Sequence, residues 1–143
     1  MMDRIIWTKD WCLDGGEIDN QHKNLISILN RIIDREININ ELIQSLIEYS
    51  SNHFVDEEVL MLQNNYPVDN YLLHKQEHRF FTKALLEISF GLLEVANSEE
   101  FEKVIKKVEH FCFTWFNTHF MNVDRELVNF LKLGGGTKNI ECN

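Results

Sequence analysis

The sequence predicts an all-α protein, folded as an up-down-up-down four-helix bundle with an extended N-terminal arm. Apolar residues recur at steps of three and four in four separate blocks, which is the period of a helix rather than of a strand. The chain has one proline and six glycines, so few breakpoints interrupt long helices. Its 143 residues suffice for one domain with a buried core. We expect the bundle to span residues 1–133, followed by a flexible C-terminal tail over residues 134–143.

The first two helices are predicted over residues 19–36 and 40–63. The first follows a DGG loop and carries an apolar stripe through Leu29. The second carries a similar stripe through Leu46 and ends before the segment NNYP, because Pro67 prevents simple continuation of a helix.

The third and fourth helices complete the predicted bundle. The third opens near Asp69, and Ser98, followed by two acids, is predicted to cap the fourth, which runs on through Trp115. Four helices of roughly 18 to 26 residues joined by short connections are typical of an up-down-up-down bundle. The residues before the first helix are expected to form an arm that packs Trp7 and Trp11 on the bundle.

The charge balance argues against several classes of partner. Fourteen basic and twenty-three acidic residues give a formal net charge of −9, which disfavours nucleic acid and anionic membrane surfaces. The opening residues contain no apolar signal segment, and no apolar run approaches the length of a membrane span. Three cysteines at irregular spacing suggest no disulfide framework and fit a reducing compartment. We therefore expect a cytoplasmic protein, monomeric because the bundle consumes its apolar faces.

Five of the six histidines lie on the predicted apolar stripes rather than on the solvent faces. They are His22, His53, His74, His78 and His119. Burying one polar side chain without a partner costs on the order of 2 kcal/mol or more, so several on facing helices indicate a shared partner. A metal ion is such a partner, and imidazole with carboxylate suits iron, zinc, copper or manganese.

The spacing of these residues agrees with metal binding. His53 with Glu57 and His74 with His78 are i, i+4 pairs, whose side chains project from one face of a helix. Glu58 is rotated by about 100° from Glu57 and is expected to be replaceable.

The remaining candidates are less well placed. Asp124 follows His119 by five residues, which is about 140° around a regular helix. Either the helix tightens there or Asp124 reaches the site from another direction. His110 misses the apolar stripe. Together with Asp56, Glu58 and Glu77 it is expected to be solvated or to contact a ligand residue from outside the centre.

Four segments taken in order closely resemble motifs of the hemerythrin family, in its bacterial form. They are IDNQH at 18–22, HFVDEEVLM at 53–61, HKQEH at 74–78 and WFNTHFMNVD at 115–124. Each motif alone is weak, whereas four in this order and spacing are highly specific. The resemblance implies a non-haem centre of two Fe ions with an oxo or hydroxo bridge.

The resemblance also implies how seven ligands divide between the two irons. His74, His78 and His119 would hold one iron, His22 and His53 the other, and Glu57 and Asp124 would bridge both. With two carboxylate oxygens and the oxo or hydroxo bridge at each iron, the first is six-coordinate and the second five-coordinate. The open position is where this family binds O2 reversibly.

The residues one turn from these ligands are candidates to line an O2 pocket, although each would otherwise be ordinary core. They are Leu25, Ile26, Met61, Trp115 and Phe116. Phe116 stands where the family often has an aliphatic residue, so its ring would narrow the pocket and alter the O2 affinity or the autoxidation rate.

The sequence therefore predicts an O2-binding protein for carriage, storage, scavenging or sensing, rather than an enzyme, with an unidentified reductant. Two alternatives use the same iron centre: a di-iron oxidase or peroxidase, and a protein that handles nitric oxide or iron. A third is a structural, zinc-holding bundle. Ferritin-like di-iron oxidases use mostly carboxylate ligands, so a histidine-rich site favours binding over oxidation.

Overall fold

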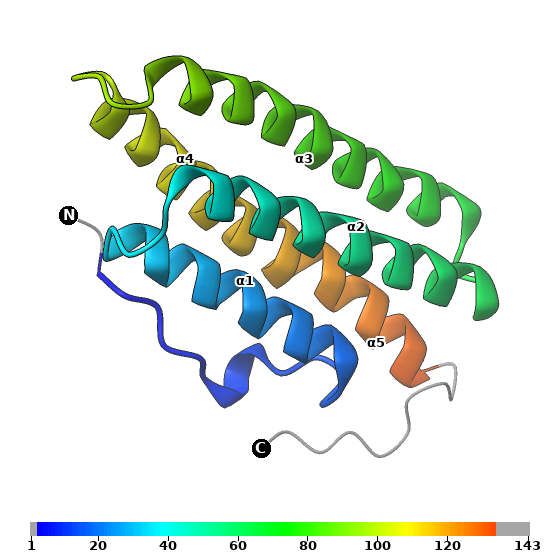
Figure 1. Ribbon diagram of the computed structural model, residues 1–143. Coiled ribbons are helices and arrows are strands. Elements are labelled where there is room, and N and C mark those ends of the chain that lie inside the picture. The colour runs from blue at the N-terminus through cyan, green and yellow to red at the C-terminus, as the bar shows by residue number, and fades with distance from the viewer. Residues whose placement is uncertain (1–2, 134–143) are drawn as a thin grey trace.

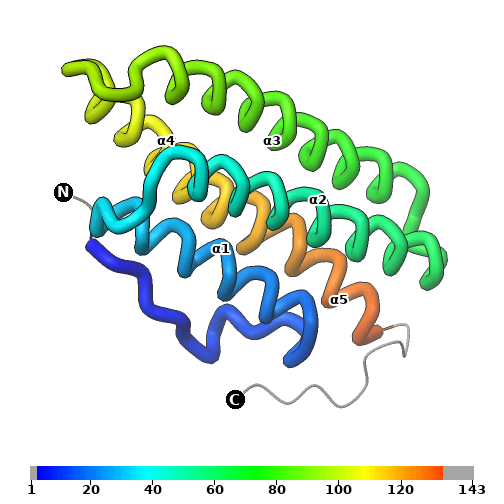
Figure 2. The backbone as a smooth tube through the Cα atoms, in the orientation of Figure 1, coloured from blue at the N-terminus to red at the C-terminus, as the bar shows by residue number. Residues whose placement is uncertain are grey.

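The computed structural model describes residues 3–133 and arranges them as an all-α four-helix bundle (Figure 1). Its helices are α1 (Glu17–Ile33), α2 (Ile39–Gln63), α3 (Val68–Val95), α4 (Phe101–Trp115), the π-helix η2 (Phe116–Asp124) and α5 (Arg125–Leu133). The segment from α4 through η2 to α5 runs as one continuous rod and forms the fourth helix of the bundle (Figure 2). The predicted fold class is confirmed, and the predicted tail lies outside the described residues.

Each helix of the bundle packs against two others. α1 contacts α2 and α4, and α3 also contacts α2 and α4. The order of buried residues along α2 shows that the interior contains a polar layer between two apolar clusters. Leu46 belongs to a large apolar cluster, His53 and Glu57 follow, and Met61 belongs to a second apolar cluster. The candidate site therefore lies in the middle of the bundle with apolar packing on both sides.

The loop before α1 is held by two carboxylates. Asp14 accepts hydrogen bonds from the backbone N–H groups of Gly16, Ile18 and Asp19, so it satisfies donors that the first turn leaves free. Asp19 accepts from Leu13 and Gly15 in return, both at 2.8 Å. These contacts fix the start of α1 one turn before His22.

Helix ends differ from the predicted ones at two places. α1 ends three residues early, because Arg35 adopts a left-handed conformation with φ of 57°. α4 begins at Phe101 with Glu100 as its N-cap, so the prediction that Ser98 is the cap is wrong. Ser98 Oγ instead donates to Val95 O and accepts from Glu100 N, which stabilises the turn that precedes the helix.

The N-terminal arm packs on the bundle as predicted. It contains the short helix η1 (Lys9–Trp11), and its Trp7 ring stacks on Phe120 at 6.1 Å. Trp11 meets Phe116 edge to face at 4.9 Å. Within residues 3–133, no helix has the length and apolar character needed to cross a membrane.

Two expectations about the surface and the cysteines are corrected. α2 and α3 expose large apolar side chains, among them Val55, Leu62 and Phe80, so the bundle does not consume all apolar faces and the monomer prediction loses that support. Cys12 is disulfide-bonded, contrary to the expectation for the cysteines. Cys112 is a free thiol in the core, where burial raises its pKa to about 12.

Candidate metal centre

All seven predicted ligand residues come together in the middle of the bundle. α1 contributes His22, α2 contributes His53 and Glu57, α3 contributes His74 and His78, and η2 contributes His119 and Asp124. None of them is more than 3% exposed. The core-facing stripes inferred from the sequence therefore converge on one buried polar cluster.

The cluster divides into two groups that share both carboxylates. One group comprises His74, His78, His119, Glu57 and Asp124, and the other comprises His22, His53, Glu57 and Asp124. Within each group, one potential ligand atom from every residue lies within 4.8 Å of all the others. The residues thus form two adjoining candidate metal sites with three histidines in one and two in the other.

Glu57 directs one oxygen toward each group. Its Oε2 lies 3.0 Å from His74 Nε2 and 3.0 Å from His78 Nε2. Its Oε1 lies 3.2 Å from His53 Nε2, in the other group. A carboxylate in this position has one oxygen available to each of two cations.

Asp124 makes the equivalent contacts from η2. Its Oδ1 lies 2.9 Å from His119 Nε2 and 3.1 Å from His74 Nε2, whereas Oδ2 lies 2.8 Å from His22 Nε2. The π-helix explains how a residue five positions after His119 reaches the site. Its hydrogen bonds join residues five apart, so the backbone winds more widely and His119 and Asp124 share a face. Of the two alternatives that the spacing left open, the tightened helix is wrong, because the helix widens.

Several buried atoms of the cluster have no hydrogen-bond partner in the described part of the chain. They are Glu57 Oε1, Asp124 Oδ1, His119 Nε2 and the Nδ1 atoms of His22 and His74. The first three face the centre of the cluster at distances of about 3 Å from neighbouring ligand atoms, without forming hydrogen bonds. A cation in each group would satisfy these three atoms, so the donor set fits two metal ions.

Electrostatics inside the cluster favour ionised carboxylates. Burial alone would raise the pKa of Glu57, but His53, His119 and His74 hold this pKa well below its usual range. Burial likewise opposes a charge on His53 and His74, yet the neighbouring carboxylates raise the pKa of each to about 9. The two carboxylates therefore retain protons on these imidazoles until a metal replaces them.

An outer hydrogen bond orients His53. Its Nδ1 lies 2.5 Å from Gln21 Oε1, and the Gln21 amide donates in turn to Asp56 Oδ2 at 2.6 Å. A proton fixed on Nδ1 leaves the Nε2 lone pair free to face the centre.

Two carboxylates orient histidines of the other group in the same way, through contacts with Nδ1. His78 Nδ1 lies 3.2 Å from Glu58 Oε2, and His119 Nδ1 lies 3.4 Å from Glu77 Oε1. The contact of Glu58 argues against the expectation that this residue is replaceable. Sequence spacing gives no signal for these pairs, because each joins two different helices. His110 is exposed and takes no part in the cluster.

Aromatic rings cover four of the five histidines. Trp115 stacks on His119 at 4.0 Å, Phe54 stacks on His78 at 4.0 Å, Phe120 lies 4.0 Å from His22, and Tyr49 stacks on His53 at 5.1 Å. Phe54, Phe120 and Tyr49 were not predicted from the sequence, although Tyr49 precedes His53 by four residues on the same stripe.

The predicted lining residues are all buried, in different surroundings. Trp115 contacts a ligand histidine directly, and Leu25, Ile26 and Met61 belong to the apolar clusters that flank the site. Phe116 packs on Trp11 and Phe120, so it is one ring removed from His22.

Comparison with known proteins places this arrangement in context. A family model described as the hemerythrin HHE cation binding domain matches residues 16–131. A bacteriohemerythrin of Clostridium acetobutylicum is 29% identical over 134 residues, which cover 87% of this chain and 99% of the relative. A bacteriohemerythrin of Pseudomonas aeruginosa is 26% identical over 136 residues, covering 92% and 84%. A hemerythrin-like protein of Naegleria gruberi is 27% identical over 93 residues, covering 65% and 72%.

Proposed function

This chain belongs to the hemerythrin family, and from that premise we propose that it binds O2 reversibly at a non-haem di-iron centre. One observation carries the proposal: both carboxylates are shared between a group of three histidines and a group of two. His74, His78 and His119 would hold one iron, His22 and His53 the other, and Glu57 and Asp124 would bridge them. Two Fe ions with an oxo or hydroxo bridge would supply the electrons that O2 binding requires.

The unequal division of histidines supports one open position. If both irons share the carboxylates and the bridge, the iron held by His22 and His53 has one protein ligand fewer. O2 would therefore bind on the side of α1, where Phe120 lies 4.0 Å from His22.

The protein's own contribution is to orient the ligands and to exclude water. Gln21, Glu58 and Glu77 would hold the Nδ1 protons of three histidines, so that each Nε2 faces the metal. We propose that Trp115, Phe116, Met61, Leu25 and Ile26 keep the pocket apolar. A dry pocket favours reversible binding, because water and protons promote irreversible oxidation of the iron.

The donor set supports a binding role over an enzymatic one. Five histidines and two carboxylates differ from the carboxylate-rich sites of ferritin-like di-iron oxidases. We propose carriage, storage or scavenging of O2 in the cytoplasm, with a separate reductant that keeps the iron ferrous.

A visible spectrum tests the proposal. The purified protein is reduced without air, exposed to O2 and then flushed with argon. We expect a charge-transfer band that appears with O2 and disappears on flushing. Lasting conversion to the diferric spectrum with turnover of reductant would point to an oxidase. Zinc in place of iron after native purification would contradict both.

A further inference from the structure

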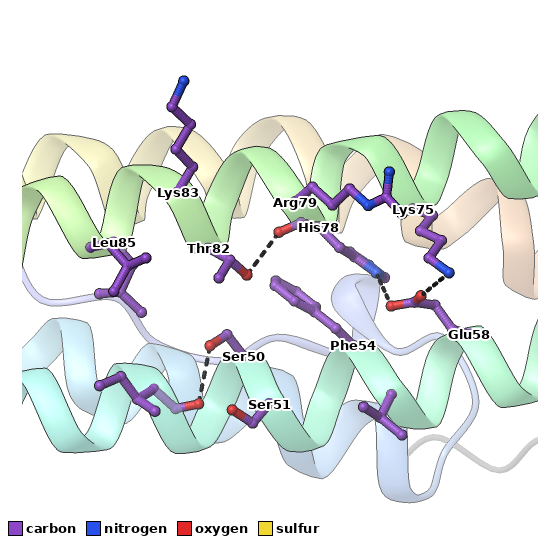
Figure 3. A pocket seen from close by; sticks show the side chains of 13 residues that line it. Ser50, Ser51, Phe54, Glu58, Lys75, His78, Arg79, Thr82, Lys83 and Leu85 are labelled. Carbon is purple, nitrogen blue, oxygen red and sulfur yellow. Dashed lines mark hydrogen bonds and ion pairs between the residues drawn. The ribbon is translucent and has the colours of Figure 1, made fainter.

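An apolar groove runs along the surface between α2 and α3 (Figure 3). Its volume is about 570 Å³, within the range of about 300–1,000 Å³ that is typical of small-molecule sites. Its apolar lining consists of Ile47, Phe54 and Val55 from α2 and of Leu85 and Leu86 from α3. Val55 is 58% exposed and Leu86 52% exposed, so this apolar surface lies open to water.

The rim of the groove on α3 is basic. Lys75, Arg79 and Lys83 follow one another at steps of four along the helix and all line the groove. The chain as a whole carries a net charge of −9, whereas the three cations make this rim of the groove positive.

Two of these cations have no acidic partner within residues 3–133. Lys75 lies 3.5 Å from Glu58, which is the single acid among the described residues that line the groove. Arg79 and Lys83 form no ion pair in that part of the structure, and Figure 3 shows Lys83 extended away from the groove into solvent. The rim thus offers two unpaired positive charges beside an exposed apolar floor.

We propose that this groove binds a free long-chain carboxylate, that is, a fatty acid. The alkyl chain lies on the apolar floor between α2 and α3, and the carboxylate pairs with Arg79 and, after the exposed side chain turns toward the groove, with Lys83. The rim from Lys75 to Lys83 extends over about 12 Å at the helical rise, so it offers a head group more than one anchoring position. A cationic amphiphile would meet repulsion here, and a neutral one would leave the rim unused.

The groove adjoins the candidate metal centre and shares His78 with it, but its lining contains none of the other six candidate ligands. Phe54 forms part of its floor and stacks on His78 with an interplanar angle of 7°. Binding of a fatty acid here requires neither iron nor O2, so its test is independent of the proposed function.

Calorimetric titration of the iron-loaded protein with dodecanoate below its micellar concentration tests the proposal. We expect saturable binding of one dodecanoate per chain. Octanoate should bind at least tenfold more weakly, because each buried methylene contributes about fourfold in affinity. The double variant Arg79→Glu/Lys83→Glu should lose at least tenfold in dodecanoate affinity. The double variant Lys106→Glu/Lys107→Glu, an equal charge reversal at two exposed positions of α4, should leave the affinity unchanged.

Four results would overturn the proposal. The first is no saturable dodecanoate binding, and the second is equal binding of dodecyltrimethylammonium. The third is sedimentation with anionic vesicles without binding of monomeric dodecanoate, which would indicate a membrane contact. The fourth is a dimer in analytical ultracentrifugation that Val55→Asp dissociates while dodecanoate fails to bind, which would make this face an interface between copies. The helical circular dichroism of each variant establishes that it is folded.

Discussion

Asp124 Oδ1 lies 2.9 Å from His119 Nε2, although a regular helix would turn residues five apart by about 140°. The π-helix η2 removes this mismatch by hydrogen bonding residues five positions apart. The extra backbone in this segment is therefore a requirement for placing both residues in one site.

Removing the carboxylate that η2 brings to the cluster tests this relationship. Asp124→Ala leaves His119 in place but takes away the oxygens that lie near His119, His74 and His22. We expect this variant to retain one iron per chain or fewer, measured by elemental analysis. Asn122→Ala changes an exposed residue of the same segment and should retain the full iron content. Two irons in Asp124→Ala would show that the carboxylate supplied by η2 is not needed for the centre.

Removing a histidine from the two-histidine group should affect one metal more than the other. His22→Ala leaves His53 as the only imidazole there, so we expect loss of about one iron per chain and of O2 binding. His110→Ala is the control, because His110 is exposed and outside both groups. Equal iron content in the two variants would contradict the assignment.

The outer contact of Glu58 predicts a measurable role. Glu58→Ala removes the acceptor 3.2 Å from His78 Nδ1, and loss of such a partner typically lowers metal affinity by about 10- to 100-fold. Competition with a chelator measures this change. Glu87→Ala, on the exposed side of α3, should leave the affinity unaltered. If Glu58→Ala also has no effect, the residue is replaceable after all.

Metal binding should release protons. Burial disfavours charge on His53 and His74, but the adjacent carboxylates raise their pKa values to about 9, so both are protonated at neutral pH. A metal binds only the neutral imidazole, so affinity must rise with pH until about 9. Displacement of one proton from His53 in one group and of one from His74 in the other predicts about a tenfold gain per site for each pH unit, which titration with Co²⁺ between pH 7 and 9 measures. An affinity independent of pH in that range would contradict the electrostatic account.

The periodicity of apolar residues in the sequence predicted most of the fold and the buried ligand residues of the site. Apolar steps of three and four placed the four helices, and the same stripes put His22 and His53 in the interior, where the structure has them. These features depend on one helix at a time, which is why a sequence pattern reveals them.

Features that depend on two helices, or on an irregular one, were not predictable in this way. The contacts of Glu58 with His78 and of Glu77 with His119 arise only when α3 is packed on its neighbours. The widening of η2 departs from the regular helical period that predicts the other helices. The residue Ser98 has the chemistry of an N-cap, but the chain makes one further turn before α4 begins.

An O2 equilibrium titration of the fully reduced protein tests the central claim most directly. If His22 and His53 leave one iron open while the shared carboxylates join it to the other, each chain with two irons binds one O2, and argon releases it. We predict saturation at one O2 per two irons, with full recovery over repeated cycles. Continued O2 consumption without release, or no uptake by protein that contains two irons, would contradict the account.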